Sequence, residues 1–117
     1  MKIRRFEDLI AWQKAQDLAV DIFFTYEHVR DFTFKNQIWG AAISVSNNIS
    51  EGFDRGSDAD FIRFLNFSRT SCNEVKSMSY LAARIKYISD EQRASFIAKT
   101  EELSKIILGL IHSLGGK

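Results

Sequence analysis

The sequence predicts an all-α protein with the architecture of an up-down-up-down antiparallel four-helix bundle. Three observations lead to this prediction. The 117 residues contain no proline and only six glycines, so the residues that break or weaken helices are scarce. Four segments space their apolar residues by three and four positions, as the buried face of a bundle helix requires. The alternation that is typical of strands does not compete with this period. A single domain over residues 1–117 is expected.

The first helix is predicted over roughly residues 8–28. Phe6 is expected to act as an apolar staple before it, and Glu7 and Asp8 are expected to supply acidic groups at its N-terminus. Its apolar positions are Trp12, Ala15, Ala19, Ile22 and Tyr26.

The second helix is expected to be capped by Asp31 or Thr33 and to weaken at Gly52 and Gly56. Its apolar positions are Ile38, Ala42, Val45 and Ile49.

The third helix is expected to start at a capping-box candidate formed by Ser57 and Asp60, and the fourth at Ser89 and Gln92. Gly115 and Gly116 are predicted to end the fourth helix. The apolar side of the third helix holds Phe61, Phe64, Leu65, Ser68, Cys72, Val75, Ser79, Ala82 and Ile85, and that of the fourth holds Phe96, Thr100, Leu103, Ile107, Leu110 and Leu114. Short connections make consecutive helices antiparallel neighbours.

Composition limits the partners and the compartment. Sixteen Lys and Arg against fifteen Asp and Glu give a net charge of +1, so no overall field favours nucleic acid or an anionic membrane. A single cysteine, Cys72, forms no internal disulfide and offers no zinc-ligand spacing, which favours the cytoplasm. The longest apolar run, residues 106–111, is too short to cross a bilayer, so no membrane partner is expected.

More aromatic side chains are present than one bundle face accommodates. Phe23 and Phe24 are adjacent and point about 100° apart on a helix. Phe61, Phe64 and Phe67 widen the apolar face of the third helix in the same way. One interpretation is a wide, partly exposed edge of the core. The other makes these five residues a candidate oligomer interface.

Polar residues also follow helical spacing beside the apolar face. The second helix carries Ser44, Asn48, Glu51 and Arg55, and the third carries Arg63, Arg69, Ser71 and Glu74. Two solvated helix faces are the ordinary interpretation. Short polar residues such as Ser and Asn are mediocre helix formers, however, so the alternative is a buried polar network of these eight residues that sets the helix register.

Several motifs resemble one protein family along residues 3–114. They are Phe6-Glu7-Asp8-Leu9 with Trp12-Gln13-Lys14-Ala15, Gln37, Ser44 to Gly52 with its Asn48-Ile49-x-Glu51-Gly52 core, Arg55-x-Ser57, Phe61-x-Arg63-Phe64-Leu65, Ser68-Arg69-Thr70-Ser71-x-x-Glu74 and Leu110-Ile111-x-Ser113-Leu114. They resemble the four-helix bundle proteins encoded in intervening sequences of bacterial large-subunit ribosomal RNA genes.

The resemblance implies a homo-oligomer, typically a ring of five subunits. It also implies similarity to the accessory variability determinant of diversity-generating retroelements, a bundle that binds a reverse transcriptase and nucleic acid through a basic surface. Two positions depart from the family pattern. Ile38-Trp39-Gly40 follows Gln37 where relatives tend to have basic residues, and Ser46 stands where they tend to have proline. The second departure predicts a straighter second helix.

No enzyme and no cofactor are expected. Carboxylate-bridged metal bundles need Glu-x-x-His pairs, and helical-bundle ribonucleases of the HEPN type need an arginine a few residues before a histidine. Neither His28 nor His112 fits these patterns, and no serine or cysteine has a base near it in the sequence.

Lys2, Arg4 and Arg5 are the candidate nucleic-acid contacts, since a cyclic assembly would repeat this cluster around one rim. The sequence therefore predicts a non-enzymatic, homo-oligomeric interaction scaffold that binds RNA, an RNA-processing protein or a reverse transcriptase. The alternative is a protein-binding or structural oligomer without a nucleic-acid role, which the balanced charge favours.

Overall fold

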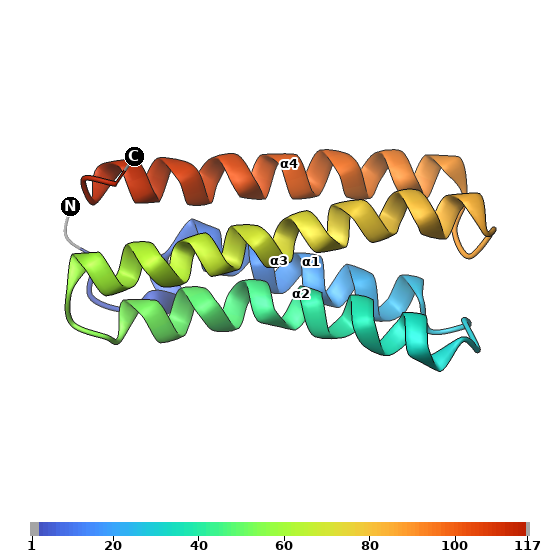
Figure 1. Ribbon diagram of the computed structural model, residues 1–117, viewed down its shortest axis with the longest axis horizontal. Helices are drawn as coiled ribbons and strands as arrows, with labels where there is room; N and C mark the ends of the chain where they lie inside the picture. Colours follow the sequence, from blue (N-terminus) through green and yellow to red (C-terminus); the bar gives the residue numbers. More distant parts are fainter. Residues whose placement is uncertain (1–2, 117) are drawn as a thin grey trace.

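The computed structural model describes residues 3–116, which form four helices joined by short turns (Figure 1). A 3-10 turn, η1 (Phe6–Asp8), precedes α1 (Ile10–Thr25), α2 (Phe32–Phe53), α3 (Asp58–Arg84) and α4 (Asp90–Ser113). The α1–α2 and α3–α4 turns lie at one end of a bundle of 43 × 21 × 20 Å, and the α2–α3 turn lies at the other. Consecutive helices are therefore antiparallel, and the predicted all-α four-helix bundle is confirmed.

Side-chain caps fix where three of the helices start. Asp31 Oδ1 accepts a hydrogen bond from the Phe34 N–H (3.1 Å), and Ser57 Oγ accepts one from the Asp60 N–H (3.2 Å). Ser89 and Gln92 form a reciprocal capping box, with distances of 3.0 and 2.9 Å. These polar groups satisfy N–H groups that a helix start leaves without partners.

The predicted bounds of the first helix, 8–28, are wrong at both ends. Leu9 is extended and buried, so the helix begins at Ile10 and the acidic residues expected in its first turn lie in η1 instead. Phe6 nevertheless packs edge-on against Trp12 of α1, with ring centroids 5.3 Å apart. At the other end the helix gives way to a turn, closed by the Val29 N–H on the Tyr26 carbonyl, that buries both of these side chains.

Helix α2 continues unbroken through Ser46 and Gly52. The helix ends at Phe53, between the two glycines that were expected to mark its end, and Gly52 also sits against α3. A Cβ atom at this position would lie 2.5 Å from the Phe64 Cβ. Gly56, with φ +89°, makes the turn that follows. Gly115, with φ +88°, ends α4 as predicted, and the Gly116 N–H donates to the Ile111 carbonyl.

The core runs along the whole bundle, and α2 and α3 form its most extensive helix contact. Its fully buried members include Ile22, Ile38, Val45, Ile49, Leu65, Val75, Leu103, Ile107 and Ile111. No helix within residues 3–116 is both long and apolar enough to span a membrane.

Candidate functional site

The centre of the predicted polar network forms between α2 and α3. Ser71 Oγ on α3 donates to Ser44 Oγ on α2 (2.8 Å). Asn48 Nδ2 donates to the same oxygen (2.9 Å) and to the Ser44 carbonyl (2.8 Å). All three side chains are half-buried. Short polar side chains thus join the two helices at the stripe that the sequence marked.

Two further serines tie neighbouring helices together. Ser68 Oγ on α3 is fully buried and donates to the Val45 carbonyl of α2 at 2.7 Å. Ser46, also buried, accepts a hydrogen bond from Gln16 Nε2 of α1 at 3.1 Å. The contact of Ser68 with α2 could be expected, because this residue lies beside the predicted stripe. Nothing in the sequence pattern predicts the pairing of Ser46 with Gln16.

Four charged members of the predicted network are exposed in the chain, so their assignment to a buried network within it is wrong: Glu51, Arg55, Arg63 and Glu74. Their long side chains reach water, because burying a charge costs more than a surface contact returns. Arg63 pairs with Asp60 (3.4 Å), and Glu74 accepts a hydrogen bond from Gln37 (3.3 Å). Arg55 and Arg63 lie over the Phe64 ring, 4.8 and 5.0 Å from its centroid.

Arg69, the remaining charged member, lines a groove on the α4 side of α3 instead of facing α2. Its side chain is half-buried, and its Nε atom is buried without a hydrogen-bond partner among residues 3–116. It therefore takes no part in the Ser44 network.

The aromatic residues predicted to form an oligomer interface divide into two groups. Phe23, Phe24 and Phe67 are 46%, 64% and 45% exposed. Phe61 and Phe64 are 8% and 7% exposed, so their assignment to a surface free for another subunit is wrong. Both pack against Gly52, whose missing side chain lets their rings close over α2.

Phe23 and Phe24 belong to a larger exposed apolar region around the α1–α2 turn. Phe32, at the start of α2, is 66% exposed, and the Phe23 ring packs against Trp39, with centroids 5.3 Å apart. A hollow of about 180 Å³ lies beside them, and its wall includes Lys35, Asn36 and Trp39. We call Phe23, Phe24, Phe32 and Trp39 the aromatic end.

The basic N-terminal cluster is only partly available for contacts with nucleic acid. Lys2 lies outside the described residues. Arg4 and Arg5 are exposed, but Arg5 Nη2 pairs with Glu7 Oε2 at 3.2 Å. This pair halves the positive charge that the two arginines present.

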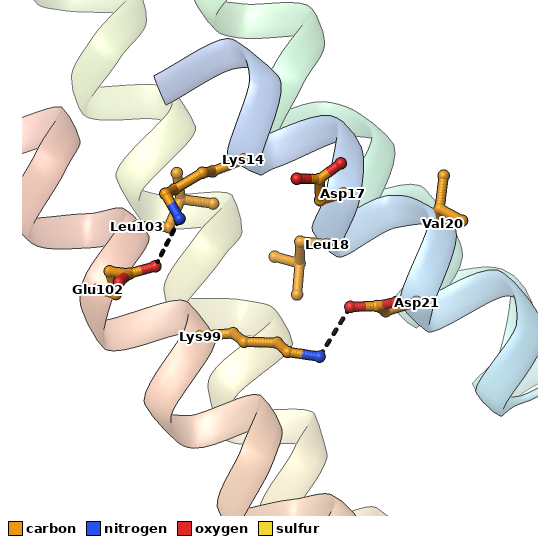
Figure 2. A pocket seen from close by; sticks show the side chains of 8 residues that line it. All are labelled: Lys14, Asp17, Leu18, Val20, Asp21, Lys99, Glu102 and Leu103. Atoms are coloured by element: carbon orange, nitrogen blue, oxygen red, sulfur yellow. Dashed lines mark hydrogen bonds and ion pairs between the residues drawn. The ribbon is translucent and has the colours of Figure 1, made fainter. Parts of the chain in front are cut away.

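Figure 2 shows the groove between α1 and α4, of about 430 Å³, with Leu18 and Leu103 among its lining residues. Lys14 pairs with Glu102 (3.2 Å), and Lys99 pairs with Asp21 (2.8 Å). Both lysines of this groove thus have a carboxylate partner. Asp17 adds a third acidic side chain, which leaves the groove negatively charged overall.

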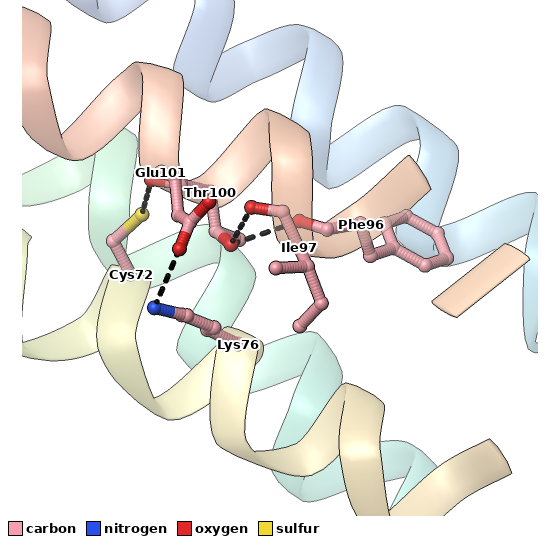
Figure 3. A network of polar contacts seen from close by, with 6 residues as sticks. All are labelled: Cys72, Lys76, Phe96, Ile97, Thr100 and Glu101. Atoms are coloured by element: carbon pink, nitrogen blue, oxygen red, sulfur yellow. Dashed lines mark hydrogen bonds and ion pairs between the residues drawn. The ribbon is translucent and has the colours of Figure 1, made fainter. Parts of the chain in front are cut away.

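A second groove, of about 340 Å³, lies between α3 and α4. Figure 3 shows Cys72 and Lys76 of α3 facing Thr100 and Glu101 of α4. Lys76 Nζ pairs with Glu101 (3.0 Å), which raises the pKa of the lysine, and Cys72 Sγ donates to the Thr100 carbonyl (3.3 Å). The groove is completed by Arg69, Asn73, Ser104, Lys105 and Leu108.

Cys72 itself is buried, and this burial raises the pKa of its thiol to about 11. A thiol of that kind is a poor nucleophile at neutral pH, because the reactive species is the thiolate. His28 and His112 are both exposed. Within residues 3–116 no group of three His, Cys, Asp or Glu side chains is placed to hold a metal ion.

Comparison with known proteins gives a consistent result. Residues 7–109 match the family model described as 23S rRNA-intervening sequence protein. A solved structure from Bacteroides thetaiotaomicron, described as a protein with unknown function from the S23 ribosomal protein family, is similar with a TM-score of 0.82. The two sequences are 29% identical, and the similarity covers 87% of this chain and 98% of the other. No curated protein matches the chain.

Proposed function

Because the chain belongs to the 23S rRNA-intervening sequence protein family, we propose that it is a homo-oligomeric, non-enzymatic scaffold that binds RNA. The observation that carries the oligomer is the aromatic end. Phe24 and Phe32 leave about two thirds of their surface in water, and Phe23 leaves almost half. Clustered aromatic surface of this kind is characteristic of protein interfaces. The resemblance noted from the sequence sets the expected copy number at five.

The RNA half of the proposal is supported by the family's association with an rRNA intervening sequence and by how charge is distributed. The net charge is only +1, so a single chain has little attraction for a polyanion. An oligomer brings several copies of each basic site onto one particle, and the affinity for nucleic acid rises with the number of phosphates contacted. The scaffold would hold RNA, or RNA together with a processing enzyme such as a reverse transcriptase.

The test is the mass in solution, measured by size-exclusion chromatography with light scattering at micromolar concentration. We expect a mass about five times that of the 13.4 kDa chain. Phe24→Ser should shift the mass toward the monomer, because it removes the most exposed ring of α1. Ile10→Ser is the matched control, since Ile10 is 60% exposed but lies at the start of α1, at the opposite end of the bundle. A monomeric wild type, or an equal effect of both variants, would contradict the proposed interface.

The alternative, a protein-binding oligomer without a nucleic-acid role, is favoured by the balanced charge and by the Arg5–Glu7 pair. RNA binding at 50 mM salt separates the two functions. A fluorescently labelled single-stranded RNA should bind the oligomer, with an affinity that falls as salt is added. An oligomer of the expected mass that binds no RNA at low salt would establish the alternative.

A further inference from the structure

We infer that the groove between α3 and α4 holds a phosphate group of the RNA backbone, between Arg69 and Lys105. This inference rests on the RNA half of the proposed function and assigns a place to it. The groove is built from one stripe on each helix. Arg69, Asn73 and Lys76 follow each other by four and three positions on α3, and Glu101, Lys105 and Leu108 do the same on α4.

The charges in this groove are unequal. Arg69, Lys76 and Lys105 stand against a single carboxylate, that of Glu101. Lys76 already occupies this carboxylate at 3.0 Å. Within residues 3–116, neither Arg69 nor Lys105 forms an ion pair, so two positive charges remain available in the groove.

Arg69 is also short of an acceptor. Its Nε–H is buried and has no hydrogen-bond partner in the described part of the chain, an arrangement that is unfavourable. The guanidinium presents its donors in a planar fork that matches two oxygens of one phosphate. Ser104 and Asn73 line the same groove and add a hydroxyl and an amide as further donors.

Two other basic places on the surface are less suited to a phosphate. Both lysines of the α1–α4 groove are paired, and its acidic groups outnumber its basic ones. Arg55 and Arg63 lie over the Phe64 ring. Acidic residues also adjoin them in the sequence, namely Glu51, Asp54, Asp58 and Asp60. Of these three places, the α3–α4 groove therefore has the most positive charge that no carboxylate offsets.

A nucleic acid fits this groove better than a protein partner does. Its lining contains no aromatic side chain, and Leu108 is its one large aliphatic residue. The hot spots of protein interfaces are enriched in Trp, Tyr and Arg, and of these three residue types the groove contains only Arg69. Charged, amide and hydroxyl groups such as those of this groove are typical of contacts to a phosphate backbone.

The experiment measures binding of a labelled single-stranded RNA of about 15 nucleotides to the intact oligomer by fluorescence anisotropy, over a series of salt concentrations. The double variant Arg69→Gln/Lys105→Gln should bind at least tenfold more weakly than wild type at 50 mM salt. Its slope of log K against log salt should be smaller by about 0.7 for each groove that the RNA occupies, since each phosphate contact on a single strand contributes about 0.7. Arg69→Lys, which keeps the charge but loses the fork, should lie between them.

The matched control is Lys14→Gln/Lys99→Gln, which removes the same two charges from the α1–α4 groove and should bind within about twofold of wild type. Ser104→Glu, which places a carboxylate in the α3–α4 groove, should abolish binding without changing the oligomer mass. If both double variants weaken binding equally, the groove assignment is overturned while RNA binding stands. If wild type binds no RNA, the RNA half of the proposed function fails, and the groove assignment fails with it.

Discussion

At the scale of single residues, side-chain length decided which members of the polar stripe entered the helix interface. Ser44, Ser71 and Asn48 are short enough to bond one another within the α2–α3 contact. Glu51 and Arg55 sit on the same stripe, but their longer side chains carry the charge out to water. The spacing of residues placed the stripe correctly, whereas burial of its charges did not follow from spacing.

Substitutions at Ser68 and at Glu51 are expected to affect the stability of the fold differently. Ser68→Ala removes a buried hydroxyl that donates to Val45 at 2.7 Å, and we expect a loss of about 1 kcal/mol in the free energy of unfolding. Glu51→Ala should change it by less than about 0.5 kcal/mol, because the Glu51 side chain is exposed. Thermal denaturation followed by circular dichroism, at one protein concentration, measures both. A clear destabilisation by Glu51→Ala would show that the oligomer buries this part of the stripe.

At the scale of the helices, two glycines of α2 test how closely it packs on α3. A Cβ at Gly52 would lie 2.5 Å from the Phe64 Cβ, which cannot swing away because it is bonded to the α3 backbone. We expect Gly52→Ala to cost about 1–3 kcal/mol, as overpacked cores do. Nothing lies within 4 Å of a Cβ at Gly40, so Gly40→Ala should stabilise the helix by about 0.5–1 kcal/mol. Urea denaturation of the two variants compares them directly, and a stabilised Gly52→Ala would refute the close packing.

The helices themselves were largely predictable from the sequence, because their signals are local. The three- and four-residue spacing marked the buried faces, and the caps at Asp31, Ser57 and Ser89 marked three starts. The start of the first helix was misplaced because Leu9 is extended and buried against other helices. The helix propensity of one segment contains no information about such contacts. The close packing of Gly52 could not be predicted for the same reason, since it depends on Phe64 of another helix.

At the scale of the whole molecule, the grooves depend on how the helices are rotated against one another. Arg69 was assigned to the side of α3 that faces α2, but it lines the groove beside α4. The two sides are about 100° apart, which is the angle between adjacent residues of a helix. Two neighbouring stripes on α3 thus serve two different partners: serines face α2, and Arg69 with Lys76 faces α4. Residue types and spacing predicted a basic and polar face on α3 but did not determine which helix this face lies against.

Alkaline pH tests the packing of the whole bundle through two buried groups from different helices. Tyr26 lies between Phe34 and Phe96 at the end of α1, and burial raises its pKa from 10.0 to about 12, with the Ser79 hydroxyl offsetting part of the rise. Cys72 on α3 has its pKa raised from 9.0 to about 11. Between pH 9 and 12 the unfolded chain therefore gives up these protons while the folded chain keeps them. The free energy of unfolding must fall as pH rises through this window, by at most about 1.4 kcal/mol per pH unit for each group.

Tyr26→Phe combined with Cys72→Ala removes both groups, and urea denaturation at pH 8, 9, 10 and 11 should give a shallower decline for this variant than for wild type. Equal declines would mean that water reaches these side chains in the folded protein.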